Sequence, residues 1–513
     1  MDTATVAMAN TASSKLSTSQ RVFLLVCLAG TSTSALTGDW KFTPTLTLSE
    51  RYSDNINLNI KGLEMSDWIT EVTPNFSLAR EGGKLKVNAN YSLQGLLYAS
   101  ASDQNDIRHS LDGRANAELV KDWLFLDSTA RISQQPLNLN AAVGLGDSVG
   151  IGNTSTVSAY TLSPYLKHRF GSAFTLDAKV TREEVFNKDS AVADTGSTRF
   201  QLGATSGARF LPLSWSGNYE KSDTDNKGLS NTGNEKATAN ARYQLSRKFG
   251  LLAQANMEKN DFVGASNLVQ DYSSFGLGAF FIPSRRVSMD VYYNSSDNGN
   301  FVSGNLTLNP TQRTTINVST SERAFGRTHA LKLAHRTRKS NWSLSYQDDL
   351  TTSQQQFTNF TGYLCPDGIL PPDPSCILVT NQPQSNETFV AKNLIGAVSY
   401  TQRKNTWNLS LFDNQREYLS TGSTDITRGV QASWSLRPGA RTTFTLTGGM
   451  SSTESNGTLG SEDDQLNLSL VATRQFLTKV SGSLEVRHQE RESNSAANDY
   501  AENSVAARLN MSF

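Results

Sequence analysis

The stretch Tyr500-Ala-Glu-Asn-Ser-Val-Ala-Ala-Arg-Leu-Asn-Met-Ser-Phe513 alternates between an apolar and a mostly polar set of residues. The apolar set consists of Val505, Ala507, Leu509, Met511 and Phe513. A period of two residues predicts an amphipathic β-strand. Such a strand is either an ordinary edge strand or the strand that closes a β-barrel by pairing with the first one. Which of the two applies depends on whether the pattern recurs along the chain.

The same alternation recurs from residue 40 onward. The clearest example begins at Leu85, where apolar or small residues alternate with Lys86, Asn88, Asn90, Ser92 and Gln94. Other examples are Phe174–Val180, Val287–Tyr293, Phe444–Met450 and Leu466–Ala472. About 24 such segments are found, each near the length of about 10 residues that a tilted membrane strand needs.

The connections between these segments alternate in length. The short ones include Phe170–Ser172, Arg247–Gly250, Pro283–Arg286, Asn309–Arg313, Arg338–Asn341, Arg403–Asn405 and Arg437–Arg441. The long ones are Glu50–Ser66, Pro136–Ser155, Asn187–Ser197, Ser222–Glu235, Thr351–Glu387 and Ser452–Glu462. Outer-membrane barrels have short periplasmic turns and long external loops, whereas a soluble β-sandwich or propeller has no reason for this asymmetry.

The sequence therefore predicts an all-β fold: a transmembrane, antiparallel, up-and-down β-barrel of about 24 strands. Closure is required because backbone groups that face lipid need partners within the protein. Charged residues of the alternating segments fall on the polar, lumenal face: Lys86, Arg114, Lys179, Lys332, Arg336, Glu485, Arg487 and Arg508. A soluble β-solenoid or propeller is the alternative fold.

The N-terminal part predicts export. The apolar run Val22–Ala29 follows Lys15 and Arg21 and precedes the small residues Thr31–Ala35. This order is typical of a secretory signal peptide. We therefore expect a signal peptide over 1–35, which is cleaved during export. The mature protein would then be an outer-membrane barrel over 36–513.

Composition and motifs give no sign of catalysis. Lys and Arg together number 47, as do Asp and Glu, so the net charge does not favour a nucleic-acid partner. The 5 His residues lack metal-ligand spacing, and no phosphate loop or nucleophile elbow is present. We expect no cofactor, no metal site and no catalytic residue, with an outer-membrane hydrolase assembled from separate strands as an alternative.

Two further pairs of residues are candidate structural sites. Cys365 and Cys376 form an even pair in an exported chain and lie in the longest external loop, which predicts a disulfide. Trp40, near the start of the first expected strand, and Phe513, at the end of the last, are expected to mark the closure of the barrel.

A further motif lies at the first long connection. Trp40–Pro44 leads to Glu50-Arg-Tyr-Ser-Asp-Asn-Ile56, followed by Ser66-Asp67, Glu71–Pro74, Ser163–Tyr165 and finally Tyr500–Asn503. This pattern resembles the outer-membrane proteins associated with PEP-CTERM (exosortase) systems, within the β-barrel porins. Its core is Tyr52, Asp54, Asn55 and Ile56. The resemblance implies a Gram-negative envelope and an association with exopolysaccharide production; it implies no catalytic residue.

These observations predict an outer-membrane channel. The expected partners are outer-membrane lipid, lipopolysaccharide, the barrel-assembly machinery and, from the resemblance, exopolysaccharide. The alternative is a structural or adhesive barrel whose external loops bind surface polysaccharide or protein without transport. No plug domain is expected before the first strand, so we expect the loop Thr351–Glu387 to narrow the pore.

Overall fold

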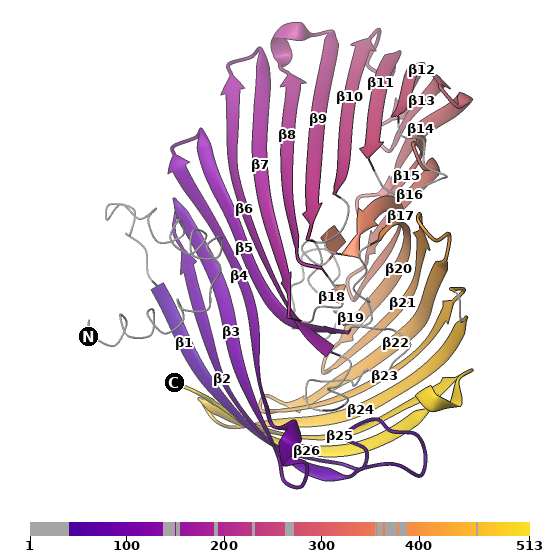
Figure 1. Ribbon diagram of the computed structural model, residues 1–513. Helices are drawn as coiled ribbons and strands as arrows, with labels where there is room; N and C mark the ends of the chain where they lie inside the picture. The colour runs from indigo at the N-terminus through magenta and orange to yellow at the C-terminus, as the bar shows by residue number, and fades with distance from the viewer. Residues whose placement is uncertain are drawn as a thin grey trace.

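The computed structural model describes residues 40–136, 149, 154–188, 193–227, 231–261, 271–353, 355–356, 363–364, 377–378, 387–457 and 460–513. These residues form 24 strands of one sheet and a separate two-stranded sheet (Figure 1). No helix among them is long and apolar enough to span a membrane.

Every strand of the large sheet is antiparallel to its neighbours. The strands are β1 (Trp40–Ser53), β2 (Asp67–Glu81), β3 (Leu85–Tyr98), β4 (Asp106–Val120), β5 (Leu124–Pro136), β6 (Thr154–Phe170), β7 (Phe174–Asn187), β8 (Thr195–Ser206), β9 (Leu213–Asn226), β10 (Thr232–Gln244), β11 (Phe249–Asp261), β12 (Asp271–Ser284), β13 (Val287–Ser296), β14 (Gly299–Thr311), β15 (Thr314–Arg323), β16 (Gly326–Arg336), β17 (Ser340–Thr352), β20 (Thr388–Gln402), β21 (Asn405–Tyr418), β22 (Thr424–Gly439), β23 (Thr442–Ser455), β24 (Ser461–Leu477), β25 (Val480–Ser493) and β26 (Tyr500–Ser512). The small sheet pairs β18 (Tyr363–Leu364) with β19 (Ile377–Leu378). Short 3-10 turns, η2 (Ser102–Gln104), η4 (Ala208–Phe210) and η5 (Ala496–Asn498), lie in the connections.

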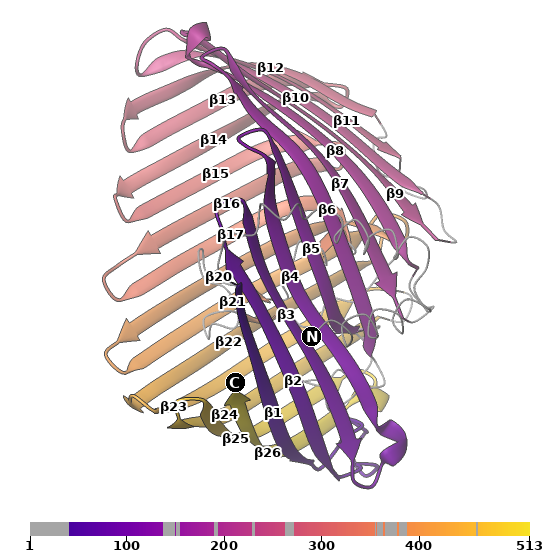
Figure 2. The same ribbon diagram turned by 90° about the vertical axis from the view of Figure 1, so that its left-hand side faces the viewer.

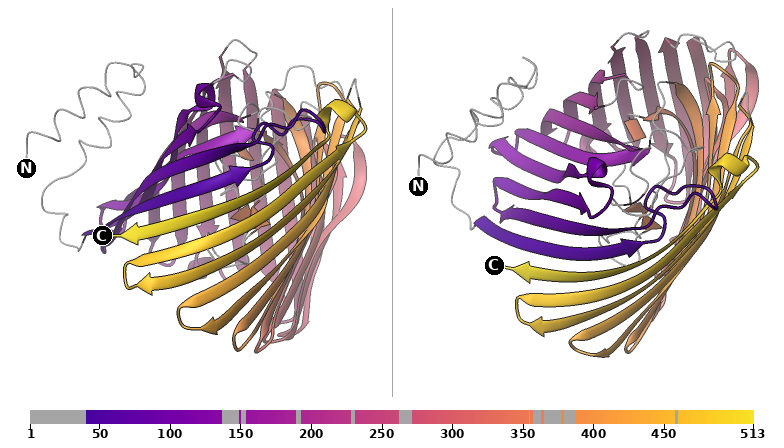
Figure 3. Two further views of the ribbon diagram at one scale, coloured as in Figure 1. Left: turned by 90° about the horizontal axis from the view of Figure 1, so that it is seen from below. Right: turned by 60° about the horizontal axis from the view of Figure 1, so that its bottom comes forward.

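The sheet closes on itself. Consecutive strands pair along the chain, β17 pairs with β20, and β26 pairs with β1. The two ends of the barrel domain therefore lie side by side at one rim, as Figures 2 and 3 show. The predicted fold, a closed antiparallel up-and-down barrel of 24 strands, is confirmed.

The two faces of the wall differ in chemistry. On the outer face, large apolar side chains are exposed: Leu97, Tyr293, Met450 and Leu484 are 53%, 62%, 61% and 61% exposed. The alternate residues, which face the lumen, are mainly hydroxyl, amide and charged side chains, such as Asn88 and Asn90 on β3. The period of two in the sequence thus separates an apolar outside from a polar inside.

Two of the predicted long loops are shorter in the structure. The ladder between β9 and β10 continues as far as Thr224 opposite Thr232, and that between β23 and β24 reaches Ser455 opposite Ser461. Much of the expected loops Ser222–Glu235 and Ser452–Glu462 is therefore strand. The expectation was wrong because it took loss of apolar residues as the end of a strand. Backbone pairing continues with polar side chains where the strand no longer contacts lipid.

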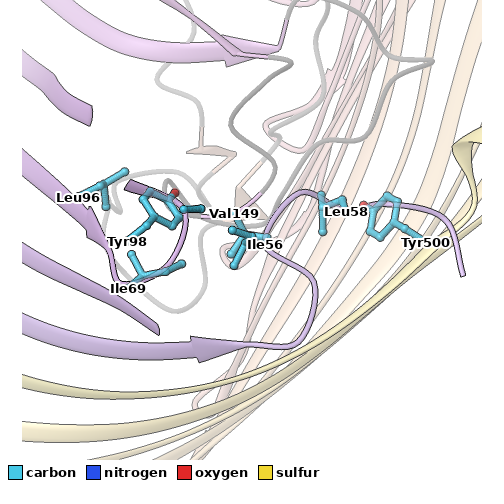
Figure 4. Close-up of a cluster of buried hydrophobic side chains, with 8 residues drawn as sticks. Ile56, Leu58, Ile69, Leu96, Tyr98, Val149 and Tyr500 are labelled. Carbon is cyan, nitrogen blue, oxygen red and sulfur yellow. The ribbon is translucent and has the colours of Figure 1, made fainter. Parts of the chain in front are cut away.

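A small apolar cluster lies inside the barrel near one rim. It joins Ile56 and Leu58, in the connection between β1 and β2, to wall residues and to Val149 of the β5–β6 connection (Figure 4). The wall residues are Ile69, Leu96, Tyr98 and Tyr500, with Ala101 beside them. The β1–β2 connection is therefore packed against the inner wall at this rim.

Candidate functional site: the closure seam and the lumenal wall

The closure seam is the ladder between β1 and β26. It runs from Thr45 opposite Ser512 to Ser53 opposite Ser504, and the Phe513 amide donates to the Pro44 carbonyl at 3.1 Å. Trp40 lies beyond this ladder, opposite Arg80 of β2. The strands that contain Trp40 and Phe513 thus close the barrel, while those two residues flank the end of the ladder, with both side chains exposed.

Charged side chains cross the seam on its lumenal side, and all of them are buried except the half-buried Arg508. We call Arg51, Glu71, Glu485, Arg487, Glu502 and Arg508 the seam cluster. It contains three arginines and three glutamates from β1, β2, β25 and β26. Its charges therefore balance, as a group withdrawn from water requires.

Arg51 is the centre of the seam cluster. It is 2% exposed and lies 3.6 Å from Glu71 on one side and 3.4 Å from Glu485 on the other. It also donates to the Ser504 hydroxyl at 3.1 Å. Arg508 approaches the same Glu485 carboxylate at 2.6 Å. One guanidinium thus links β2, β25 and β26 to the first strand.

The contact between Arg51 and Glu485 passes over a third strand. Both residues lie directly opposite Ala506 of β26, one on each side. Ala506 is 1% exposed, and its methyl group is small enough for the two long side chains to meet above it. A larger side chain at this position would occupy the space in which the ion pair forms.

The residues of the family-like motif also lie at the seam. Asp54 accepts hydrogen bonds from the Asn503 backbone amide at 2.7 Å and from its side-chain amide at 2.8 Å. Asn55, fully buried, donates to the Ala501 carbonyl at 3.0 Å and to the Asn59 carbonyl at 2.8 Å. The two parts of the motif, far apart in sequence, therefore bind each other.

The other motif residues complete the same contact. The Tyr52 ring lies 5.2 Å from that of Trp68 on the outer face, and Ile56 packs in the apolar cluster with Tyr500. The hydroxyl group of Ser53, which lies between Tyr52 and Asp54 in the sequence, donates a hydrogen bond to Glu502 at 2.8 Å. The structure thus assigns these residues to joining β1, its following loop and β26.

The lumenal wall from β4 to β15 carries paired charges. Nitrogen–oxygen distances are 3.7 Å for Arg131–Asp112, 3.7 Å for Lys179–Asp127, 3.5 Å for Arg199–Glu220 and 3.0 Å for Arg323–Glu258. Each pair joins opposite charges, so this part of the wall presents no strong excess of one sign.

Sequence reasoning placed Glu485, Arg487 and Arg508 on the lumenal face but did not find the seam cluster. Alternation shows which face a residue occupies, not which distant strand lies beside it. The clue present in the sequence was the co-occurrence of opposite charges on the inward faces of the first and last strands. Among the described residues, no group of three or more His, Cys, Asp or Glu could hold a metal ion.

Cys365 and Cys376 lie outside the described residues. Their described neighbours Leu364 and Ile377 pair directly across the small sheet, which brings the chain together beside both cysteines and favours the disulfide.

We expect the mature, oxidised protein to show no free thiol at Cys365 and Cys376, and two thiols after reduction. The bridge would stabilise its loop by about 2–3 kcal/mol, since it closes a short ring. Maleimide labelling of the denatured protein, with and without reductant, checks this. The variant Cys365→Ser is the control, because it must expose one thiol without reductant. Two labelled thiols in the unreduced wild type would exclude the bridge.

Comparison with known proteins gives structural neighbours only. No family model and no curated protein matches the sequence. The siderophore receptor PirA from Pseudomonas aeruginosa is 11% identical, with a TM-score of 0.43 over 92% of this chain and 80% of that one. The FrpB iron transporter from Neisseria meningitidis is 11% identical, with a TM-score of 0.46 over 93% and 83%. Pseudomonas aeruginosa OpdK, solved with vanillate, is 9% identical, with a TM-score of 0.38 over 92% and 99%.

Proposed function

We propose that the protein is an outer-membrane channel for hydrophilic solutes. The observation that carries the proposal is the combination of a closed wall, an exposed apolar outer face and a polar inner face. Soluble proteins rarely expose apolar patches larger than a few hundred Å². Lipid around the barrel would cover this outer face, and closure leaves no unpaired strand edge along the 24-stranded wall in lipid.

The polar wall supports water in the lumen. Barrels of 16–18 strands already leave an aqueous channel, and diameter grows with strand number. Hydroxyl, amide and charged side chains cannot pack as a dry core. The channel therefore fits this geometry better than a barrel with a filled interior.

The association with exopolysaccharide and with PEP-CTERM systems is the finer part of the proposal. It rests on the sequence motif at Tyr52–Ile56, whose residues bind the Tyr500–Asn503 segment at the seam. These contacts give the motif a structural role at the closure seam.

The test is electrical. We expect the refolded mature protein to give stepwise currents in planar bilayers. The reversal potential in a potassium chloride gradient should lie near zero, because the ion pairs of the lumenal wall and of the seam cluster join opposite charges. Heat-unfolded protein is the control. If neither the intact protein nor a variant lacking Leu364–Ile377 conducts, the channel is excluded and the adhesive or structural barrel takes its place.

A further inference from the structure

One aromatic ring lies flat on the lumenal wall. Phe412 of β21 pairs with Gly429 of β22. A Cβ atom built at Gly429 would lie 2.7 Å from Phe412 Cε1, so the ring covers the backbone of the neighbouring strand. Only a glycine at position 429 leaves room for this arrangement. The Phe412 side chain is half-buried and belongs to the lumen-facing set of β21, because the alternate residues Leu409 and Leu411 are exposed on the outer face.

The lumen-facing residues immediately around Phe412 carry no charge, and the nearest lumen-facing charged residues on β21 and β22, Arg416 and Asp425, lie one lumenal position further and oppose each other. The lumen-facing residues beside it are Ser410 and Asn414 on its own strand, Asn393, Ile395 and Ala397 on β20, and Thr427 and Gln431 on β22. Beyond them, β23 contributes Gly449, Ser451 and Thr453. This uncharged strip differs from the part of the wall between β4 and β15, where ion pairs recur.

The strip also has unused hydrogen-bonding groups. Within the described part of the chain, the side-chain amides of Asn393, Asn414 and Gln431 make no hydrogen bond. All three are half-buried beside the Phe412 ring. Each amide offers two donors and one acceptor oxygen, so a solute on the ring would meet several donors and acceptors.

A second aromatic ring on the lumenal wall is covered by another side chain. Phe280 of β12 lies over Gly250 in the same manner, but the Arg242 guanidinium stacks 3.5 Å from its ring centre, and Phe280 is only 1% exposed. No described cation or ring stacks on Phe412 in this way. Of the two rings, Phe412 is therefore the more exposed.

We infer that the strip around Phe412 binds an uncharged saccharide chain; this inference rests on the proposed channel function and names the class of its cargo. The apolar C–H face of a sugar ring stacks on an aromatic ring, while its hydroxyl groups bind amides and hydroxyls. A charged solute would find no counter-charge on this strip and would lose its hydration without compensation. The chemistry therefore selects neutral over anionic saccharides.

Isothermal titration calorimetry on the full mature chain, folded in detergent, tests the inference. The probes are maltohexaose, a neutral oligosaccharide, and an oligogalacturonate of equal length, which is anionic. We expect maltohexaose to bind, and Phe412→Leu to weaken its affinity about tenfold, because the ring is lost while most of the volume remains. Phe444→Leu on the outer face of β23 is the matched control and should bind like the wild type.

Three outcomes would overturn the saccharide site: no binding of maltohexaose to the folded wild type, unchanged affinity in Phe412→Leu, or equal binding of the anionic probe. Migration of the unheated variants on SDS gels verifies that each one is folded. Because calorimetry does not require conduction, failure of this inference is distinguishable from failure of the channel, which bilayer currents decide separately.

Discussion

Ala506→Leu is expected to prevent stable closure of the barrel. The new side chain would occupy the space above β26 in which Arg51 meets Glu485. Overpacking alone costs about 1–3 kcal/mol. Separating a buried ion pair costs about 3–5 kcal/mol, because charges that remain buried lose their partners. Ala506 is a small residue without a polar group of its own, so these effects come from the space it leaves.

Ala507→Leu is the matched control for this prediction. Ala507 is the next residue along β26 but is exposed on the outer face, so a leucine there should change stability by no more than about 0.5 kcal/mol. Urea unfolding in lipid vesicles and migration of unheated samples on SDS gels measure the effect. Equal unfolding midpoints for Ala506→Leu and the wild type would show that the seam cluster contributes little to closure.

Excision of Leu364–Ile377 is expected to enlarge the single-channel current about twofold or more, since conductance rises with the free cross-section of the lumen. Figure 1 places β18 and β19, which contain the first and last residues of this segment, within the ring of strands. Gln356, shortly after β17, accepts a hydrogen bond from Arg416 of β21 at 2.9 Å. Arg416 faces the lumen, so the chain turns inward after β17.

Gln356→Ala provides a milder version of the same test. It removes the acceptor and leaves Arg416 in place, so we expect a smaller increase in current with unchanged folding. Both variants are compared with the wild type by single-channel recording at one salt concentration. Unchanged step sizes in the excised form would show that this segment does not limit the pore, and the packed β1–β2 connection would become the first constriction to consider.

Much of the fold follows from alternation in the sequence. The period of two in Leu85–Leu97 and Val505–Phe513 defines strands, because each residue type selects one face of a lipid-covered wall. The ends of the strands could not be predicted from alternation, since residues such as Ser222 and Thr224 are polar yet remain in the ladder. Where a strand extends beyond the lipid, its backbone hydrogen bonds continue, although its side chains no longer show the apolar alternation.

The seam cluster and the strip around Phe412 could not be predicted from the sequence, for a different reason. Arg51 and Glu485 are separated by 434 residues, and their contact requires Ala506, from a third strand, to be small. Phe412 lies flat only because Gly429 is its direct partner. Both features depend on register between strands, which local pattern does not determine. The sequence pattern included both Tyr52–Ile56 and Tyr500–Asn503, but nothing in it indicated that the two segments bind each other.

The closure seam has a consequence for biogenesis. Ser53 and its partner Glu502 are separated by 449 residues. The second edge of the first strand therefore cannot be paired until nearly the whole chain is present. Until then, apolar strand faces and an open edge are exposed together, a condition that promotes aggregation in slowly folding β-proteins. We therefore expect the early strands to need protection during assembly, and we expect the pairing of β26 with β1 to be the step that completes the barrel.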